Sequence, residues 1–227
     1  RATVKQSLHD FDGSLADLDL VAAREPTNLR AWLTRATVLT VLGRYDEAAA
    51  SLESALQVEP RHIGSIELRG KVLVAQGNYD AATTLYENLL QRTDAADLRG
   101  ELAKLFAHAG RVDDARRQVE RGLELARVAA TQYPAERRHL IGFLADVDPA
   151  FAVQLARQDL ELRSDIHSSA WLASSLLQDG KADEAATYLD EALRLGTQDP
   201  WLLYQAGSVY AAIGDTGRAR ELLTAAL

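Results

Sequence analysis

Histidine is the residue type with the most potential for metal or acid–base chemistry in this chain, because cysteine is absent. The five histidines lie in separate parts of the sequence, and no two of them flank a carboxylate at i,i+4 spacing; they are His9, His62, His108, His139 and His167. A zinc-protease motif needs that spacing, and a structural zinc site normally uses cysteine ligands. We therefore expect no metal site, no cofactor and no catalytic residue.

Nucleotide, nucleophile and nucleic-acid chemistry also lack their sequence signatures. The glycines are spread along the chain instead of forming a phosphate-binding loop, and no serine stands in a strand–turn–helix pattern. The net charge of −8 argues against a nucleic-acid partner, because phosphate binding needs a dense basic surface. No apolar run approaches the roughly 18 residues of a membrane span. These absences favour a protein that binds other proteins and is not an enzyme.

Residues suited to anchoring a protein partner gather in the last third of the sequence. They are His167, Trp171, Trp201 and Tyr204. Trp201 and Tyr204 are three residues apart and would share one face of a helix. Tryptophan and tyrosine are also the side chains that most often dominate binding energy at interfaces. The alternative is that Trp171 and Trp201 seal a joint between neighbouring helical units, and the sequence leaves both interpretations open.

The elements that carry these residues are marked by five glycines. Gly43, Gly77, Gly110, Gly180 and Gly214 are separated by 34, 33, 70 and 34 residues, so the longest gap covers two periods. A period near 34 in an alanine-rich and leucine-rich chain is typical of stacked helical hairpins. We expect each glycine to end the first helix of a hairpin in the left-handed conformation.

Small and acidic residues recur at fixed distances from these glycines. A small residue precedes each glycine by seven positions, and an alanine follows each by five; such side chains let two helices approach closely. Three residues after four of the glycines stands an aspartate that could cap or favourably charge the second helix, namely Asp46, Asp80, Asp113 and Asp183.

Residues 29–62 are the clearest unit, and this unit resembles a tetratricopeptide repeat. The matching signature residues are Trp32, Ala36, Leu39, Gly43, Tyr45, Ala48, Leu52, Ala55 and Pro60. Less complete units follow at 63–95, 96–131, 166–199 and 200–227, with a partial unit at 1–28 in which His9 replaces the glycine. A divergent unit at 132–165 has an expected first helix at 135–145 and a second helix opened by Asp148 and Pro149. The resemblance implies an all-α, right-handed α-α superhelix, a single solenoid of about six to seven hairpins over residues 1–227.

The resemblance also implies a binding groove, because the first helix of every unit lines a concave face in this family. Its candidate peptide-binding residues are Leu33, Thr37, Lys71, Lys104, His167, Trp171, Trp201 and Tyr204. Trp32 stands at the core tryptophan position and is expected to be structural. Chaperone adaptors of the family hold a terminal carboxylate with lysine and asparagine, and Leu33 and Thr37 stand at those two places here. A chaperone-tail adaptor is therefore not expected.

The segment 104–139 carries eight lysines and arginines against five acidic residues, a local charge of +3 in a chain of −8. Such a patch could steer an acidic peptide. Arg116, Arg117 and Arg121 fall on a second helix, however, where a solvated face with ion pairs is the alternative explanation.

The leading hypothesis is a non-catalytic interaction module that binds an extended or helical peptide segment of a protein partner. One alternative is a self-associating scaffold, a homo-oligomer that forms through the uncapped last repeat with Leu222, Leu223 and Leu227 at its edge. The other is a targeting domain of a larger enzyme. Methionine is absent, so a leader or an upstream domain could be missing, and cytoplasm and periplasm both fit. Arginine outnumbers lysine 21 to 4, which is typical of GC-rich bacterial genomes.

Overall fold

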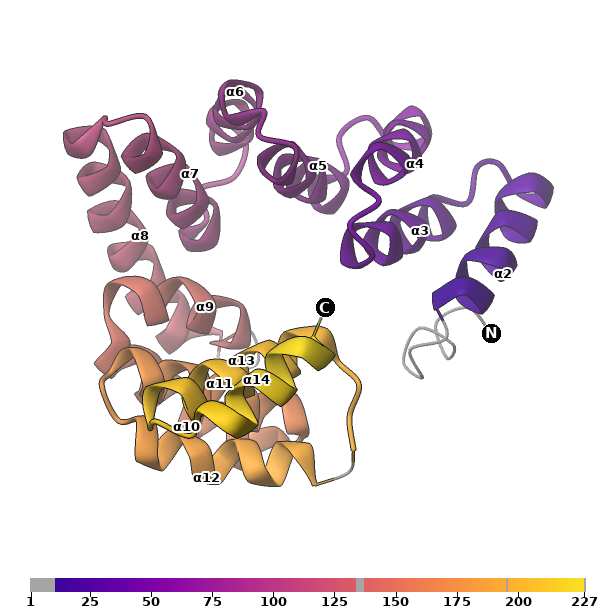
Figure 1. Ribbon diagram of the computed structural model, residues 1–227. Coiled ribbons are helices and arrows are strands. Elements are labelled where there is room, and N and C mark those ends of the chain that lie inside the picture. Colours follow the sequence, from indigo (N-terminus) through magenta and orange to yellow (C-terminus); the bar gives the residue numbers. More distant parts are fainter. Residues whose placement is uncertain (1–10, 134–136, 195, 227) are drawn as a thin grey trace. The chain divides into compact units, whose positions relative to one another are not determined.

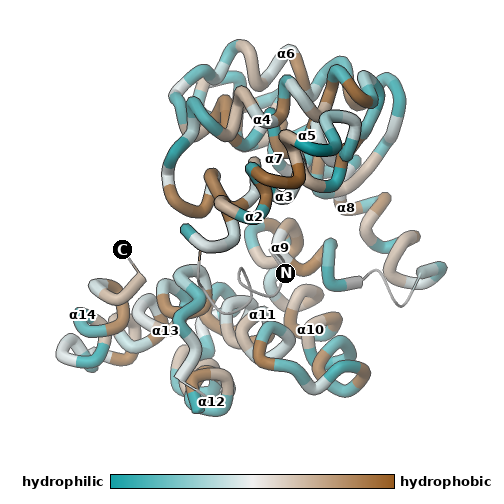
Figure 2. Tube along the Cα trace, turned by 90° about the vertical axis from the view of Figure 1, so that its right-hand side faces the viewer, coloured by the Kyte–Doolittle hydropathy of each residue, from teal (hydrophilic) through white to brown (hydrophobic). Residues whose placement is uncertain are grey.

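A computed structural model describes residues 11–133, 137–194 and 196–226 (Figure 1). Every regular element in this part of the chain is an α-helix, and hydrophilic and hydrophobic residues are interspersed along the trace (Figure 2). The helices are α2 (Phe11–Arg24), α3 (Leu29–Val41), α4 (Tyr45–Val58), α5 (Ile63–Ala75), α6 (Tyr79–Leu90), α7 (Ala96–His108), α8 (Val112–Gln132), α9 (Arg137–Val147), α10 (Pro149–Arg163), α11 (Ile166–Gln178), α12 (Ala182–Leu193), α13 (Pro200–Ala212) and α14 (Thr216–Ala225). The predicted fold class, an all-α solenoid of helical hairpins, is confirmed.

The five repeating glycines have the left-handed backbone that the sequence predicts. Their φ angles are 70° at Gly43, 75° at Gly77, 73° at Gly110, 76° at Gly180 and 86° at Gly214. At the first of these turns, the N–H of Gly43 donates to the carbonyl of Thr40 at 3.1 Å, and the N–H of Arg44 donates to that of Leu39 at 2.9 Å. These bonds satisfy carbonyl groups at the end of α3, so the glycine both stops the helix and turns the chain.

The repeated aspartates lie inside the first turns of the second helices and not at the N-cap positions. Asp46, Asp80, Asp113 and Asp183 all lie in the first turn of their helices. The residues at the N-cap positions of α4, α6 and α12 make no side-chain capping bond. An acid in the first turn still interacts favourably with the positive end of the helix dipole. Side-chain caps are found on several first helices, where Asn28, Asp165 and Asp199 accept from backbone N–H groups.

The divergent hairpin has the second helix that the sequence predicts. Asp148 caps α10 by accepting from the N–H of Phe151 at 3.3 Å, and Pro149 occupies the first helical turn. The first helix, α9, spans Arg137–Val147, where 135–145 was expected. The preceding helix, α8, ends at Gln132, and residues 134–136 lie outside the described residues.

The chain divides into two compact units. Unit 1 comprises Arg1–Asp94 and Glu101–Ala115, and unit 2 comprises Ala95–Gly100 and Arg116–Leu227. The core of unit 1 includes Ala36, Leu39, Ala48 and Leu52, none of which is exposed. The core of unit 2 is built mainly from α9 to α13. The description of residues 1–227 as one continuous solenoid, with the repeat boundaries given above, stays a prediction.

Candidate functional site

The first helices of the last three hairpins contact one another in sequence, α9 with α11 and α11 with α13. Two capping aspartates set where the latter two helices begin. Asp165 accepts from the N–H of Ser168 at 2.7 Å, and Asp199 accepts from the N–H of Leu202 at 3.1 Å. His167 and Trp171 therefore lie on the first two turns of α11, and Trp201 and Tyr204 lie on those of α13.

Trp171 and Trp201 contact each other across the two helices. Their ring centroids are 4.6 Å apart and their planes are inclined by 47°, a tilted packing that is favourable for aromatic pairs. Both side chains are half-buried and pack against the core of unit 2. On its other side Trp171 lies against α9 at Gly142, where a β-carbon would come 3.2 Å from Cη2 of the indole. The glycine thus makes room for the ring.

The indole N–H groups of this pair have no acceptor within the described part of the chain, and neither nitrogen is one of its buried unpaired polar atoms. Both donors therefore reach solvent. Trp32 behaves differently, because its indole N–H donates to the carbonyl of Pro26 at 2.8 Å. That bond fits the structural role expected for Trp32. The indole N–H of Trp32 is thus already hydrogen-bonded within the protein, whereas those of Trp171 and Trp201 can still donate to a ligand.

Tyr204 extends this surface outward, since 56% of the residue is exposed. Trp171, Trp201 and Tyr204 are here called the aromatic site. Its two indole N–H groups and one phenol hydroxyl stand on an apolar base, which is suited to binding the carbonyl groups of a peptide. His167, one turn before Trp171 on α11, is exposed beside it.

The other four candidate residues belong to unit 1. Leu33 packs against the core there, and the hydroxyl of Thr37 donates to the carbonyl of Leu33 at 2.9 Å. Lys71 on α5 and Lys104 on α7 are exposed, and the ammonium of Lys104 lies 3.9 Å from the carboxylate of Glu101. Their part in a binding surface stays a prediction.

A buried ionic cluster beneath α11 was not anticipated from the sequence. The side chain of Asp159 on α10 is 3% exposed and accepts from the guanidinium of Arg138 at 3.0 Å and from the hydroxyl of Ser168 at 2.8 Å. Arg163 adds a contact at 3.1 Å. Arg138 also donates to Asp165, so the cluster ties α9 and α10 to the start of α11. It therefore positions the helix that carries Trp171.

Burial and hydrogen bonding act in opposite directions on this cluster. Burial works against charge on both Arg138 and Asp165. Hydrogen bonds from the Ser168 backbone and from Arg138 outweigh it at Asp165 and hold the pKa of that carboxyl below its usual value. Asp159 and Asp165 likewise raise the pKa of Arg138. The two shifts favour the ion pair between Arg138 and Asp165.

The basic excess of segment 104–139 is partly neutralised by carboxylates. Arg111 pairs with Asp114 at 2.7 Å, Arg121 pairs with Glu124 at 2.9 Å, and Arg127 lies 3.6 Å from Asp148. These contacts fit the solvated-face alternative better than an open anion-binding patch.

Among the described residues, no group of three or more histidine, aspartate or glutamate side chains could hold a metal ion. None of the helices described is long and apolar enough to span a membrane.

Comparison with protein families identifies the class of repeat. Residues 73–133 match one tetratricopeptide repeat model, and residues 1–62 and 153–200 match another. The chain belongs to the tetratricopeptide repeat family. Proteins built from this repeat are generally non-catalytic, and the fold of this chain supports a protein–protein interaction module in general. A search of curated proteins gave no match.

Two solved structures illustrate the fold. A tetratricopeptide repeat protein from Parabacteroides merdae is 16% identical, with a TM-score of 0.51 over 99% of this chain and 95% of that chain. The APC/C hetero-tetramer Cut9–Hcn1 is also 16% identical, with a TM-score of 0.55 over 100% of this chain and 45% of that chain. At this identity the likeness concerns the fold alone.

Proposed function

We propose that the aromatic site of unit 2 holds an extended peptide segment of a partner protein. The observation that carries the proposal is the pair of indole N–H donors of Trp171 and Trp201, which have no acceptor among the described residues. Carbonyl groups of a helical segment are already bonded within the helix. An extended segment leaves its carbonyls free. Two adjacent donors therefore favour an extended ligand over a helical one.

The energetics support a small anchoring site. Trp171 and Trp201 are fixed by packing against the core and against each other, so binding orders few of their torsions. Tyr204 is the most exposed residue of the three, at 56%. Burial of one such side chain at the centre of an interface contributes about 2 kcal/mol or more in many complexes. Moderate affinity can therefore arise from three side chains.

The test uses a library of random 12-residue peptides displayed on phage and selected on the purified 227-residue chain. Peptides that bind are synthesised and titrated against Tyr204→Ala. We expect a class of peptides whose affinity falls at least tenfold, about 1.4 kcal/mol. Tyr133→Ala is the matched control, because Tyr133 is 54% exposed and lies away from α11 and α13 in the sequence. It should change the affinity by less than twofold.

The proposal fails if every selected peptide binds Tyr204→Ala as well as the unchanged chain. It also fails if Tyr133→Ala causes an equal loss. Of the residues named for self-association through the last hairpin, Leu222 and Leu223 are half-buried, and Leu227 lies outside the described residues.

A further inference from the structure

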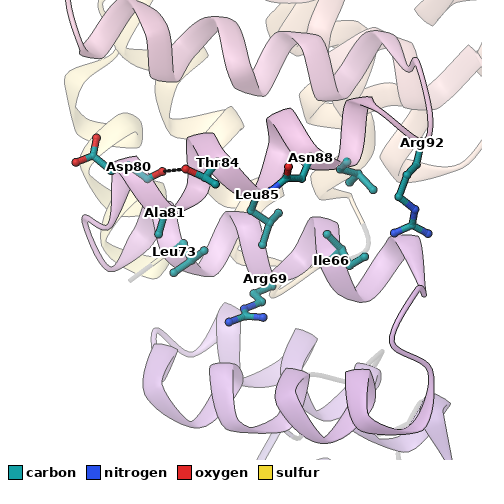
Figure 3. A pocket seen from close by; sticks show the side chains of 10 residues that line it. Ile66, Arg69, Leu73, Asp80, Ala81, Thr84, Leu85, Asn88 and Arg92 are labelled. Atoms are coloured by element: carbon teal, nitrogen blue, oxygen red, sulfur yellow. Dashed lines mark hydrogen bonds between the residues drawn. The ribbon is translucent and has the colours of Figure 1, made fainter.

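A hollow lies in unit 1, between α5 and α6, and has a volume of about 580 Å³ (Figure 3). It is here called the α5–α6 pocket. Its base is apolar and includes Ile66 and Leu73 from α5 and Leu85 from α6. Arg69 and Arg92 line its rim. The volume falls within the range of about 300–1,000 Å³ that is typical of ligand pockets. None of the candidate residues from the sequence lines it.

The two arginines of this pocket lack carboxylate partners. Arg69 makes no hydrogen bond or ion pair with any residue that the structure describes. Arg92 donates to the backbone carbonyl of Arg61 at 2.9 Å, which leaves its positive charge unbalanced. Both side chains are exposed. Asp80 is the single acidic residue of the lining and lies at the opposite end from Arg92 (Figure 3). The two arginines therefore place positive charge beside the apolar base of the pocket.

The preceding hairpin indicates what an arginine at this place binds. Arg35 stands 34 residues before Arg69, and its guanidinium donates to the carboxylate of Asp19 at 2.8 Å and to the hydroxyl of Ser51 at 2.5 Å. The residues 34 positions after those two partners are Glu53 and Leu85. Replacement of the hydroxyl by a leucine removes one acceptor and adds apolar surface. Glu53 is exposed and makes no bond to Arg69.

We propose that the α5–α6 pocket binds a partner segment in which an aspartate or glutamate stands next to a large apolar residue. The carboxylate takes the place that Asp19 has beside Arg35 and pairs with Arg69, with Arg92 in support. Arginine forms bidentate bonds with carboxylates, which gives such a contact direction as well as charge. The apolar side chain enters between Ile66, Leu73 and Leu85. This site is separate from the aromatic site and does not depend on it.

The test applies the same 12-residue phage library to the unchanged chain and to Arg69→Glu. We expect a class of peptides that binds the Arg69→Glu chain at least tenfold more weakly, and that is enriched in Asp or Glu beside Leu, Ile or Phe. These peptides should retain their affinity within twofold for Tyr204→Ala. That result separates this pocket from the aromatic site, so either proposal can fail without the other.

Arg30→Glu is the matched control, because Arg30 is an exposed arginine of the same unit that does not line the pocket. It should change the affinity by less than twofold. Leu85→Asp tests the apolar base and should weaken the same peptides at least tenfold, provided that circular dichroism shows unchanged helicity. The proposal is overturned if no peptide depends on Arg69, if the dependent peptides carry no acidic residue, or if Arg30→Glu weakens them equally.

Discussion

The ring of Tyr86 occupies the space that a side chain on Gly70 would need. A β-carbon on Gly70 would lie 2.5 Å from Cε1 and 2.5 Å from Oη of Tyr86, which is itself fully buried. Position 70 therefore tolerates only glycine as long as tyrosine follows sixteen residues later. Other hairpins have alanine and leucine at these two places, as in the pair Ala36 and Leu52. The two positions are matched in volume.

Gly70→Ala should therefore lower stability by about 1–3 kcal/mol, the usual cost of overpacking a core. Tyr86→Leu alone should also destabilise, because it leaves a cavity. The double variant restores the alanine–leucine pair and should be more stable than the sum of the two losses predicts. Urea unfolding of the four proteins measures this coupling. Strictly additive losses would show that the two residues are not matched.

Asp159→Asn should destabilise the protein by about 1–3 kcal/mol, because it removes the buried, charged acceptor that Arg138, Arg163 and Ser168 share. Glu161→Gln is the control, since Glu161 is exposed on the same helix. The control should stay within about 0.5 kcal/mol of the unchanged protein. Thermal unfolding followed by circular dichroism compares the two. An equal loss of stability in both variants would show that the ionic cluster does not hold α9, α10 and α11 together.

Asp165 gives the protein a specific pH dependence. Its pKa is lower in the folded chain than the ordinary value of 3.8, so its charge stabilises the fold above the unfolded pKa. That contribution is lost as the pH falls through the lowered, folded pKa. Asp165→Asn can still cap α11 but lacks the charge that pairs with Arg138. The stability advantage of the unchanged protein over this variant should be constant above about pH 5 and shrink below about pH 4.

The stability difference between the unchanged protein and Asp165→Asn can be measured from urea unfolding midpoints at pH 7, 5, 4 and 3. A stability difference that persists undiminished to pH 3 would contradict the charge-based explanation.

Much of the backbone could be predicted from the sequence because glycine has a specific conformational role. Gly43 and its equivalents end first helices with positive φ, as expected from their spacing. Asp148 and Pro149 begin α10 for reasons equally visible in the sequence. For Asp46 the sequence predicted either a capping or a charge role. The choice between them depends on whether the helix starts one or two residues earlier or later, and Asp46 lies in the first turn.

The residues and contacts of the binding sites were harder to predict from the sequence. The spacing of Trp201 and Tyr204 places them on one face of a helix, but the contact of Trp201 with Trp171 needs the stacking of two hairpins. Whether an indole N–H is free depends on acceptors elsewhere in the fold, as the bond of Trp32 illustrates. Arg138 and Asp159 are 21 residues apart in the divergent unit, where no periodic register aligns them.

One signal for the α5–α6 pocket did exist in the sequence. A shift of 34 residues from Arg35 and Ser51 leads to Arg69 and Leu85, so a repeat comparison of arginine partners could have identified the unpaired guanidinium.

The most direct test of the central claim observes the three indole N–H signals in a ¹⁵N–¹H spectrum while a Tyr204-dependent peptide is added. We predict that the signals of Trp171 and Trp201 shift or broaden as their donors gain carbonyl acceptors, and that the signal of Trp32 stays in place. Assignment follows from single tryptophan-to-phenylalanine variants. Saturation with peptide that leaves the Trp171 and Trp201 signals unmoved would contradict the account.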